Sequence, residues 1–279
     1  MINFAPYYTT MANVRFDTKQ EEDIEYYTDS ESLRVSLLAH HPDESLGYGD
    51  KTTGSNLYNV LKKFLANKKA AICGALVFIA VKRYPDESDV SNIISQLRAN
   101  HVMVHIAVDS VPSGGSNSAP LYEISSLTNG YCAFATGNDL SGAFDLMISI
   151  LSFPYQFLAQ NFVVSGLGRI EIPTFEIPTP VNFIEPWELA ITVQNHTLDN
   201  SFVSMNYTFE SIDGSYVYEF PRNTTSPLYG TAQTNFLHLN GSLSYKWTID
   251  YHYNTDKPQI IQIRMYCKDY HEFLPLPDF

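Results

Sequence analysis

Basic residues are scarce in this chain. Its 279 residues include 17 lysines and arginines against 30 aspartates and glutamates, which gives a formal net charge of -13 at pH 7. The basic residues are not gathered into a run. Proteins that bind nucleic acid hold its phosphates with clustered lysine and arginine side chains, so we expect no nucleic-acid partner.

Long apolar runs are also missing. The longest apolar stretch, residues 70–81, is shorter than the about 20 residues that a membrane-spanning helix needs, and it is typical of a buried parallel strand. The first residues, MINFAPYYTTMANVRF, show no charged segment followed by a long apolar one. We therefore predict no membrane span, and no signal peptide is visible in the chain as it stands.

Signatures of catalysis and of metal binding are missing as well. The chain contains no G-x-S-x-G, H-E-x-x-H, P-loop or G-x-G-x-x-G motif. Its three cysteines include no C-x-x-C pair of the kind that indicates a zinc site. We therefore predict that the protein is not an enzyme and that it has no cofactor.

Residues 1–158 alternate between strand-like and helix-like segments. A strand is predicted over residues 72–81 and another over 102–108, and between them Val90, Ile93, Ile94 and Leu97 recur at helical spacing. Such an alternation is typical of a mostly parallel sheet with helices on both faces. The predicted fold class of this region is therefore α/β and Rossmann-like.

The composition changes near residue 160. Four prolines, at positions 173, 178, 180 and 186, interrupt residues 159–187, which we predict to be an extended connector. Beyond it, apolar and polar residues alternate in SFVSMNYTFE, which is typical of a strand with one solvated face. Residues 188–279 are therefore predicted to form an all-β, sandwich-like domain with an extended C-terminal tail.

The stretch LHLNGSLSYKW predicts a hairpin around Asn240 and Gly241. A three-residue loop would pair Leu239 with Leu243 and Leu237 with Tyr245. This register places the apolar side chains on one face, so we prefer it to a two-residue loop.

Five segments of the first region occur in a characteristic order: MANVRFDT, GSNLYNVLKKFL, ALVFIAVKRYPDESDV, HVMVHIAV and LYEISSLTNGYCAFATGNDLSGAFDLM. In this order, over roughly residues 1–150, they resemble a von Willebrand factor A-type domain. The strand end VKRYP together with PSGG and TNGYC is closer still to a nematode-expanded family of secreted proteins. In that family an A-like domain precedes a β domain and often occurs near C-type lectin modules.

The resemblance implies a divalent-ion site at the carboxyl edge of the sheet, but the residues at its positions are altered. Where the family has T-D-G, this chain has Val81, Lys82 and Arg83. In the loop that matches the family's G-T-N-T, Ser55 keeps a hydroxyl group, although we prefer to explain this serine as the N-cap of the helix that follows. Hard cations need oxygen ligands, and a lysine ammonium repels a dication. We therefore predict a degenerate site without a metal ion.

The family's D-x-S-x-S motif has no counterpart, because Met1 begins where the family's second strand would lie. The region is therefore expected to lack the first central strand and to be an N-terminally truncated form of a longer secreted protein. The family's strand order would separate the Cα atoms of Cys73 and Cys132 by about 9–10 Å, whereas a disulfide needs less than about 7 Å. Both are predicted to be unpaired, and the state of Cys267 is left open.

Four N-x-[ST] sequons occur in the last third of the chain, at Asn195, Asn206, Asn223 and Asn240. Their clustering favours a secreted, glycosylated second half. The alternation in SFVSMNYTFE also predicts that Asn206 points outward.

The predicted function is non-enzymatic recognition outside the cell. The A-like region would present a loop edge that contains Lys82, Arg83, Asp109 and Ser110 to a protein or glycan partner. The family's association with lectins implies a role in defence or matrix contact. The alternatives are a structural or degenerate product without a binding site of its own and, with less support, an unrecognised hydrolase, since such a sheet edge is a usual place for ligands.

Overall fold

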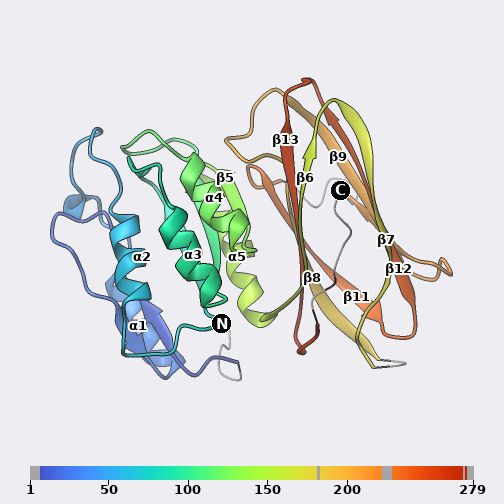
Figure 1. Ribbon diagram of the computed structural model, residues 1–279, viewed down its shortest axis with the longest axis horizontal. Coiled ribbons are helices and arrows are strands. Elements are labelled where there is room, and N and C mark those ends of the chain that lie inside the picture. Colours follow the sequence, from blue (N-terminus) through green and yellow to red (C-terminus); the bar gives the residue numbers. More distant parts are fainter. Residues whose placement is uncertain (1–6, 181–182, 222–227, 273, 275–279) are drawn as a thin grey trace. The chain divides into compact units, whose positions relative to one another are not determined.

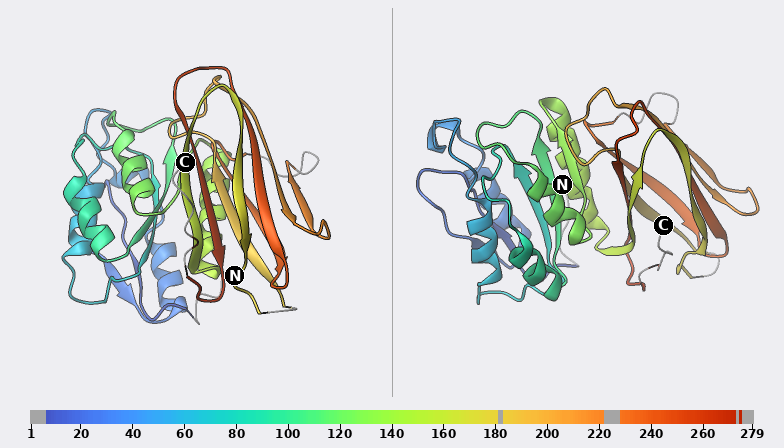
Figure 2. Two further views of the ribbon diagram at one scale, coloured as in Figure 1. Left: turned by 45° about the vertical axis from the view of Figure 1, so that its right-hand side comes forward. Right: turned by 45° about the horizontal axis from the view of Figure 1, so that its top comes forward.

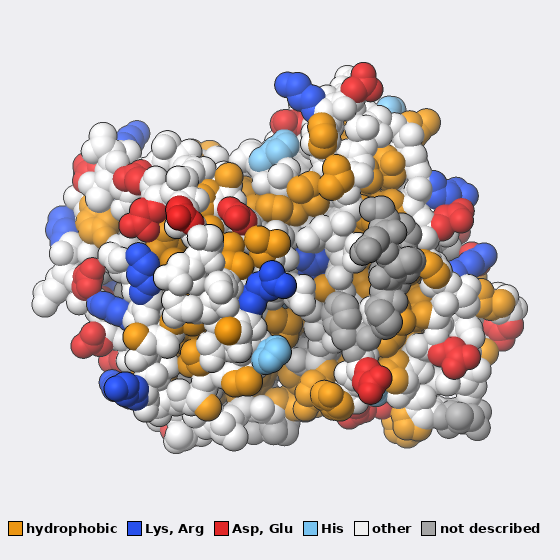
Figure 3. Space-filling view, viewed as in Figure 1, with side chains coloured by type: hydrophobic (Ala, Val, Ile, Leu, Met, Phe, Trp, Pro, Cys, Tyr) orange, Lys and Arg blue, Asp and Glu red, His pale blue; other side chains and the backbone are white. Residues whose placement is uncertain are grey.

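The computed structural model describes residues 7–180, 183–221, 228–272 and 274 (Figure 1). The chain divides into two compact units, Met1–Gly130 and Tyr131–Phe279. Within the described residues, no helix is both long and apolar enough to cross a membrane. Basic and acidic side chains are interspersed on the face of the molecule drawn in Figure 3.

The first unit contains a small antiparallel sheet, a parallel strand pair and four α-helices among its described residues. Its elements are β1 (Met11–Asn13), β2 (Glu25–Tyr27), α1 (Ser30–Ala39), α2 (Leu57–Leu65), β3 (Leu76–Val81), α3 (Ser91–Ala99), β4 (Met103–Asp109) and α4 (Ala119–Leu127), with a 3-10 turn at Glu44–Leu46. Strands β3 and β4 run parallel, from Leu76 opposite Met103 to Val81 opposite Val108. Their carboxyl ends therefore lie side by side.

Strand β4 is the centre of this unit. Val104, Ile106 and Val108 are fully buried on one of its faces, and Ala107 is fully buried on the other. Burial on both faces is what a β-branched run of this kind favours in a parallel sheet. The predicted helix after β3 is present as α3, and its Leu97 is fully buried.

The second unit begins with β5 (Cys132–Ala135) and α5 (Asn138–Ser149), followed by a 3-10 turn at Ile150–Ser152. The remaining strands are β6 (Tyr155–Val164), β7 (Leu167–Glu176), β8 (Ile184–Thr192), β9 (Phe202–Ser211), β10 (Val217–Phe220), β11 (Ala232–Asn240), β12 (Ser244–Tyr253) and β13 (Gln259–Cys267). They form two four-stranded sheets in the orders β10-β9-β12-β7 and β11-β8-β13-β6, which face each other in Figure 2.

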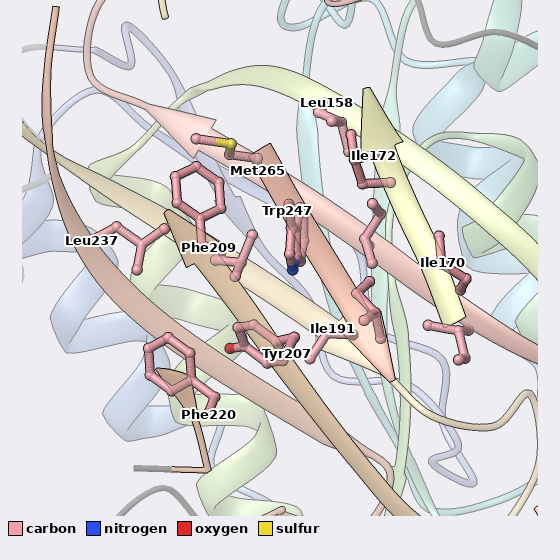
Figure 4. Close-up of a cluster of buried hydrophobic side chains, with 14 of the residues drawn as sticks. Leu158, Ile170, Ile172, Ile191, Tyr207, Phe209, Phe220, Leu237, Trp247 and Met265 are labelled. Carbon is pink, nitrogen blue, oxygen red and sulfur yellow. The ribbon is translucent and has the colours of Figure 1, made fainter. Parts of the chain in front are cut away.

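The inner faces of the two sheets share one hydrophobic core. Trp187 of β8 and Trp247 of β12 are both fully buried in it. Figure 4 shows Trp247 beside Phe209 of β9, with Leu237 and Met265 of the other sheet close by. Burying one large apolar side chain in such a core stabilises the fold by about 1.5–3 kcal/mol, so this double layer is a β-sandwich with a substantial core.

The predicted fold class, a mostly parallel Rossmann-like domain followed by a smaller β domain, is wrong for the chain. Strands account for 37% of the described residues and helices for 21%, and the two antiparallel sheets are the main feature of this part of the chain. The prediction extrapolated from the alternating elements of the first region. It missed the strands within residues 159–187, where most of β6, all of β7 and the start of β8 lie.

The prolines of residues 159–187 are compatible with strands because of where they lie. Strand β7 is at the edge of its sheet, and its register against β12 shifts near Pro173, since Tyr245 faces Phe175 while Trp247 faces Ile172. Pro186 of β8 lies before the segment that pairs with β13. Edges and bulges are the places where a sheet tolerates a missing N–H donor.

The predicted hairpin at Asn240 and Gly241 is wrong. Strand β11 pairs with β8, whereas β12 pairs with β7 and β9 in the opposite sheet. The chain therefore crosses from one sheet to the other at this turn. A Cβ atom on Gly241 would lie 2.1 Å from the carbonyl oxygen of Thr179, so this close approach of two backbones requires glycine.

Candidate functional site

The carboxyl ends of β3 and β4 are joined by the loops that follow them. The carbonyl oxygen of Lys82 accepts hydrogen bonds from the backbone N (2.7 Å) and the Oγ (3.0 Å) of Ser113. The Tyr84 backbone N donates to the Gly114 carbonyl oxygen (2.8 Å), and the Tyr84 hydroxyl donates to that of Asp109 (2.8 Å). We call Asp17 together with residues 50–56, 82–84 and 109–114 the rim.

Arg83 is a buried cation at the centre of the rim, with only 6% of its surface exposed. Its guanidinium donates to the carbonyl oxygens of Asp50 (Nη2, 2.8 Å) and Thr53 (Nη1) and lies over the ring of Tyr48, 5.2 Å from the centroid. A Cβ atom on Gly114 would come within 1.9 Å of Nη1. The guanidinium is thus enclosed by backbone on more than one side.

The loop that binds Arg83 is itself shaped by a carboxylate. Asp50 Oδ1 accepts from the backbone N of Thr52 (2.8 Å) and of Thr53 (2.6 Å). These hydrogen bonds lower the pKa of Asp50 well below its ordinary value. The loop therefore presents its carbonyl oxygens toward Arg83 as a consequence of its own local structure.

Asp17 is the residue of the rim that the sequence pattern did not reveal. Its carboxylate accepts from Ser55 Oγ (2.8 and 3.0 Å) and from the Asn56 backbone N (2.8 Å). Burial raises the pKa of this carboxyl group, while the hydrogen bonds from Ser55 and Asn56 and the charge of Arg83 act in the opposite direction. The Ser55 hydroxyl donates to Asp17 and accepts from the backbone N of Leu57 at the start of α2 (3.2 Å), as expected of a serine that caps a helix.

Lys82 and Asp109, two residues of the predicted partner-binding edge, come together. Lys82 Nζ lies 3.4 Å from Asp109 Oδ2, with the lysine side chain 71% exposed and the aspartate side chain 5% exposed. Ser110 is half-buried, and Val111 beside it is 66% exposed. The outward side of the rim therefore combines one cation with one apolar side chain.

The resemblance placed Lys82 in the position of the family's metal-binding aspartate, but in the structure Lys82 points outward and Arg83 inward. Val81 is 1% exposed, so the alternation of strand β3 continues past its end. Extending that alternation by two residues would have found the buried cation in the sequence. Among the described residues, no group of three or more histidines, cysteines and carboxylates is placed to hold a metal ion.

A second surface lies on the outward face of the sheet β10-β9-β12-β7. It is a polar groove of about 570 Å³, lined by Arg169, Glu171, Ile172, Pro173, Thr174, Thr208, Glu210, Lys246, Thr248 and Asp250. The register places Thr208 opposite Thr248, and Thr248 opposite Glu171. Two ion pairs flank this row, Arg169 with Asp250 (2.7 Å) and Lys246 with Glu210 (2.9 Å).

The four sequon asparagines differ in their surroundings. Asn206 is exposed on β9 and lies opposite Asp250. Asn195 and Asn240 are half-buried, and Asn240 Oδ1 accepts from the backbone N of Ser242 (2.9 Å). Asn223 lies outside the described residues.

The outward face of the other sheet contains a buried acid, Glu188, which the sequence pattern also did not single out. Its side chain is 0% exposed, and Ser149 Oγ at the end of α5 donates to its Oε1. Burial raises the pKa of Glu188 to about 8, against the lowering effect of the Ser149 hydrogen bond. Because no part of this carboxyl group reaches the surface, it is a feature of the interior rather than of a substrate site.

All three cysteines are free thiols, with Cys73 exposed and Cys132 and Cys267 buried. Burial raises the pKa of Cys267 to about 12, and the pKa of Cys132 is raised for the same reason. Neither buried thiol is therefore in the thiolate form that nucleophilic chemistry requires.

Residues 160–268 match the model of a domain of unknown function, DUF7154, and so cover the sandwich from within β6 to the end of β13. No curated protein matches the chain. The resemblance of residues 1–150 to a von Willebrand factor A-type domain stays a prediction, since the family match lies outside them.

Several solved structures share a limited likeness. The Yersinia pseudotuberculosis-derived mitogen is 16% identical over 41% of this chain and 87% of its own, with a TM-score of 0.25. The K1 cleaved adhesin domain of Lys-gingipain from Porphyromonas gingivalis is 11% identical (38% and 72%, TM-score 0.22). A carbohydrate-binding module of Cellvibrio mixtus lichenase 5A, in complex with cellotriose, is 14% identical (43% and 93%, TM-score 0.22). These scores are too low to assign a function.

Proposed function

We propose that this protein is a non-enzymatic recognition module that acts outside the cell and binds a protein or glycan partner at the rim without a metal ion. The burial of Arg83 is the observation that carries this proposal. Its guanidinium binds the loop at residues 50–53, and its positive charge lowers the pKa of Asp17. The chain itself thus supplies the positive charge that a bound cation would otherwise supply at this edge.

The outward side of the rim has the chemistry of a small contact surface. Lys82 is anchored by Asp109 at one oxygen but keeps most of its side chain in solvent, and Val111 adds exposed apolar surface beside it. In a chain with a net charge of -13, an exposed cation at a structured edge favours a partner that carries an anionic group. The clustered sequons support the extracellular location.

Removal of divalent ions is expected to leave the protein unchanged. Adding EDTA should shift neither the melting temperature nor the binding of a partner, because Arg83 rather than a metal ion holds the rim together. Melting curves with EDTA, with calcium and with magnesium test this directly. A melting temperature that rises with either ion would contradict the metal-free rim.

The charge reversal K82E is expected to weaken partner binding about 10-fold, which corresponds to about 1.4 kcal/mol. The measurement is binding of the full chain to arrays of glycans and of extracellular-matrix proteins, carried out in EDTA. The matched control is K68E, because Lys68 is also exposed but follows the C-terminal end of α2, whereas the rim precedes the N-terminal end of that helix. Equal binding by the two variants would refute the rim as the binding site.

A further inference from the structure

The acceptor residue of one sequon lies at the end of the polar groove. Asn206 is exposed on β9, and its neighbour across the sheet, Asp250, lines the groove. Thr208, the third residue of the same sequon, also lines the groove. The asparagine and the groove therefore belong to one face of one sheet.

Asn206 is more exposed than the other described sequon asparagines, Asn195 and Asn240. Within the described part of the chain, its side-chain amide makes no recorded hydrogen bond. The Asn240 side chain, in contrast, accepts from Ser242 in a turn, and its backbone N donates to the hydroxyl of Tyr245 (2.7 Å). Asn195 is half-buried. A substituent on the Asn206 amide would therefore break no hydrogen bond among the described residues.

The groove has the chemistry of a surface for sugar hydroxyl and acetamido groups. The hydroxyls of Thr208 and Thr248 make no recorded hydrogen bond, and the carboxylate of Glu171 beside them accepts none, so donors and an acceptor are available in one row across the strands. None of the lining residues is aromatic. A free sugar would find no ring to stack on, whereas a sugar tethered beside the groove needs only weak contacts, because its effective concentration is high.

We propose that Asn206 carries an N-linked glycan and that its first sugar residues lie in the groove against Thr208, Thr248 and Glu171. The proposal rests on the extracellular location in the proposed function.

In the attachment step, the amide nitrogen of Asn206 attacks the anomeric carbon of a lipid-diphosphate-linked oligosaccharide. A C–N bond forms, the C–O bond to the diphosphate breaks, the lipid diphosphate leaves with the electron pair, and the nitrogen loses one proton to a base. The glycan then covers this face of the sheet β10-β9-β12-β7.

The first test is glycan occupancy of the full chain, made in eukaryotic cells with an added secretory leader. The leader makes the result independent of how the native protein is routed, so a failure here is distinct from a failure of the proposed function. Enzymatic release of N-glycans in heavy-oxygen water, followed by peptide mass spectrometry, marks each occupied asparagine. Asn206 is expected to be occupied in the wild type and in T208S, and one glycan is expected to be lost in N206Q and T208V. An unmodified Asn206 in the wild type overturns the proposal.

The second test asks where the glycan lies. The rate of chemical acylation of Lys246, which lines the groove, is compared between the glycosylated wild type and N206Q, with the exposed Lys257 as the control. The glycan is expected to slow the reaction of Lys246 several-fold and to leave Lys257 unchanged. Equal rates at Lys246 in the two proteins overturn the groove as the position of the sugars.

Discussion

The difference in the free energy of unfolding between E188Q and the wild type is expected to shift in favour of E188Q as the pH rises from 5 to 8. The pKa of Glu188 is raised from 4.5 to about 8 by burial. Between these values the folded protein keeps a proton that the unfolded chain has lost, so the wild type loses stability as the pH rises. Each pH unit corresponds to about 1.4 kcal/mol, and the whole interval to at most about 5 kcal/mol. Glutamine does not titrate, so the variant lacks this loss.

The other groups around Glu188 do not obscure this effect. Tyr131 and Tyr266 sense its charge, but burial raises the pKa of both, so they stay protonated over this range. Ser149 can still donate to the amide oxygen of glutamine. The new NH2 group, however, would take the place of Oε2, an atom for which no hydrogen-bond partner is recorded among the described residues. The variant is therefore expected to start about 1–3 kcal/mol below the wild type at pH 5.

Urea unfolding at several pH values measures this difference. The control is E219Q, which makes the same change of charge at an exposed position of β10. A stability difference between E188Q and the wild type that stays constant from pH 5 to pH 8 would show that Glu188 does not bind the proton.

R83M is expected to destabilise the first unit by about 3 kcal/mol. Methionine retains much of the length of the side chain, but the carbonyl oxygens of Asp50 and Thr53 lose their donor and Asp17 loses a nearby positive charge. Each buried polar group that is left without its partner costs about 1–3 kcal/mol. The measurement is urea unfolding followed by circular dichroism.

The matched control for R83M is R98M, since Arg98 is exposed on α3 and its replacement should change stability by less than about 0.5 kcal/mol. Both tryptophans, Trp187 and Trp247, lie in the second unit, so their fluorescence reports separately on the sandwich. If the free energy of unfolding falls no more for R83M than for R98M, the guanidinium does not stabilise the rim.

Several local features were predictable because they depend on neighbours in the sequence. The run at β3, the helical spacing in α3 and the outward position of Asn206 follow from periodicity, which reports which face of an element is buried. The approach of Lys82 and Asp109 also followed, since the carboxyl ends of adjacent parallel strands lie at one edge. The burial of Arg83 also follows from this alternation, but the sequence analysis did not extend the alternation beyond the end of β3.

Which strands pair with one another was not predictable in the same way. Leu239 and Tyr245 face one core, and a hairpin register would satisfy their alternation as well as two facing sheets do. Only the pairing of β11 with β8 and of β12 with β7 and β9 distinguishes the two arrangements. Likewise, Pro173 excludes a central strand but not an edge strand, and the sequence does not say which strand lies at the edge.

The contact of Asp17 with Ser55 joins residues 38 positions apart, and no local pattern indicates it. The sequence by itself determined β3, β4, α3, the outward face of β9 at Asn206 and the positive charges after β3, but not the strands within residues 159–187. Only the tertiary structure decided which sheet each strand joins, which of those charges is buried and which acid shares the rim with it. The reason is that periodicity records burial alone, whereas pairing depends on the free energy of the whole core and on the partners that a distant part of the chain provides.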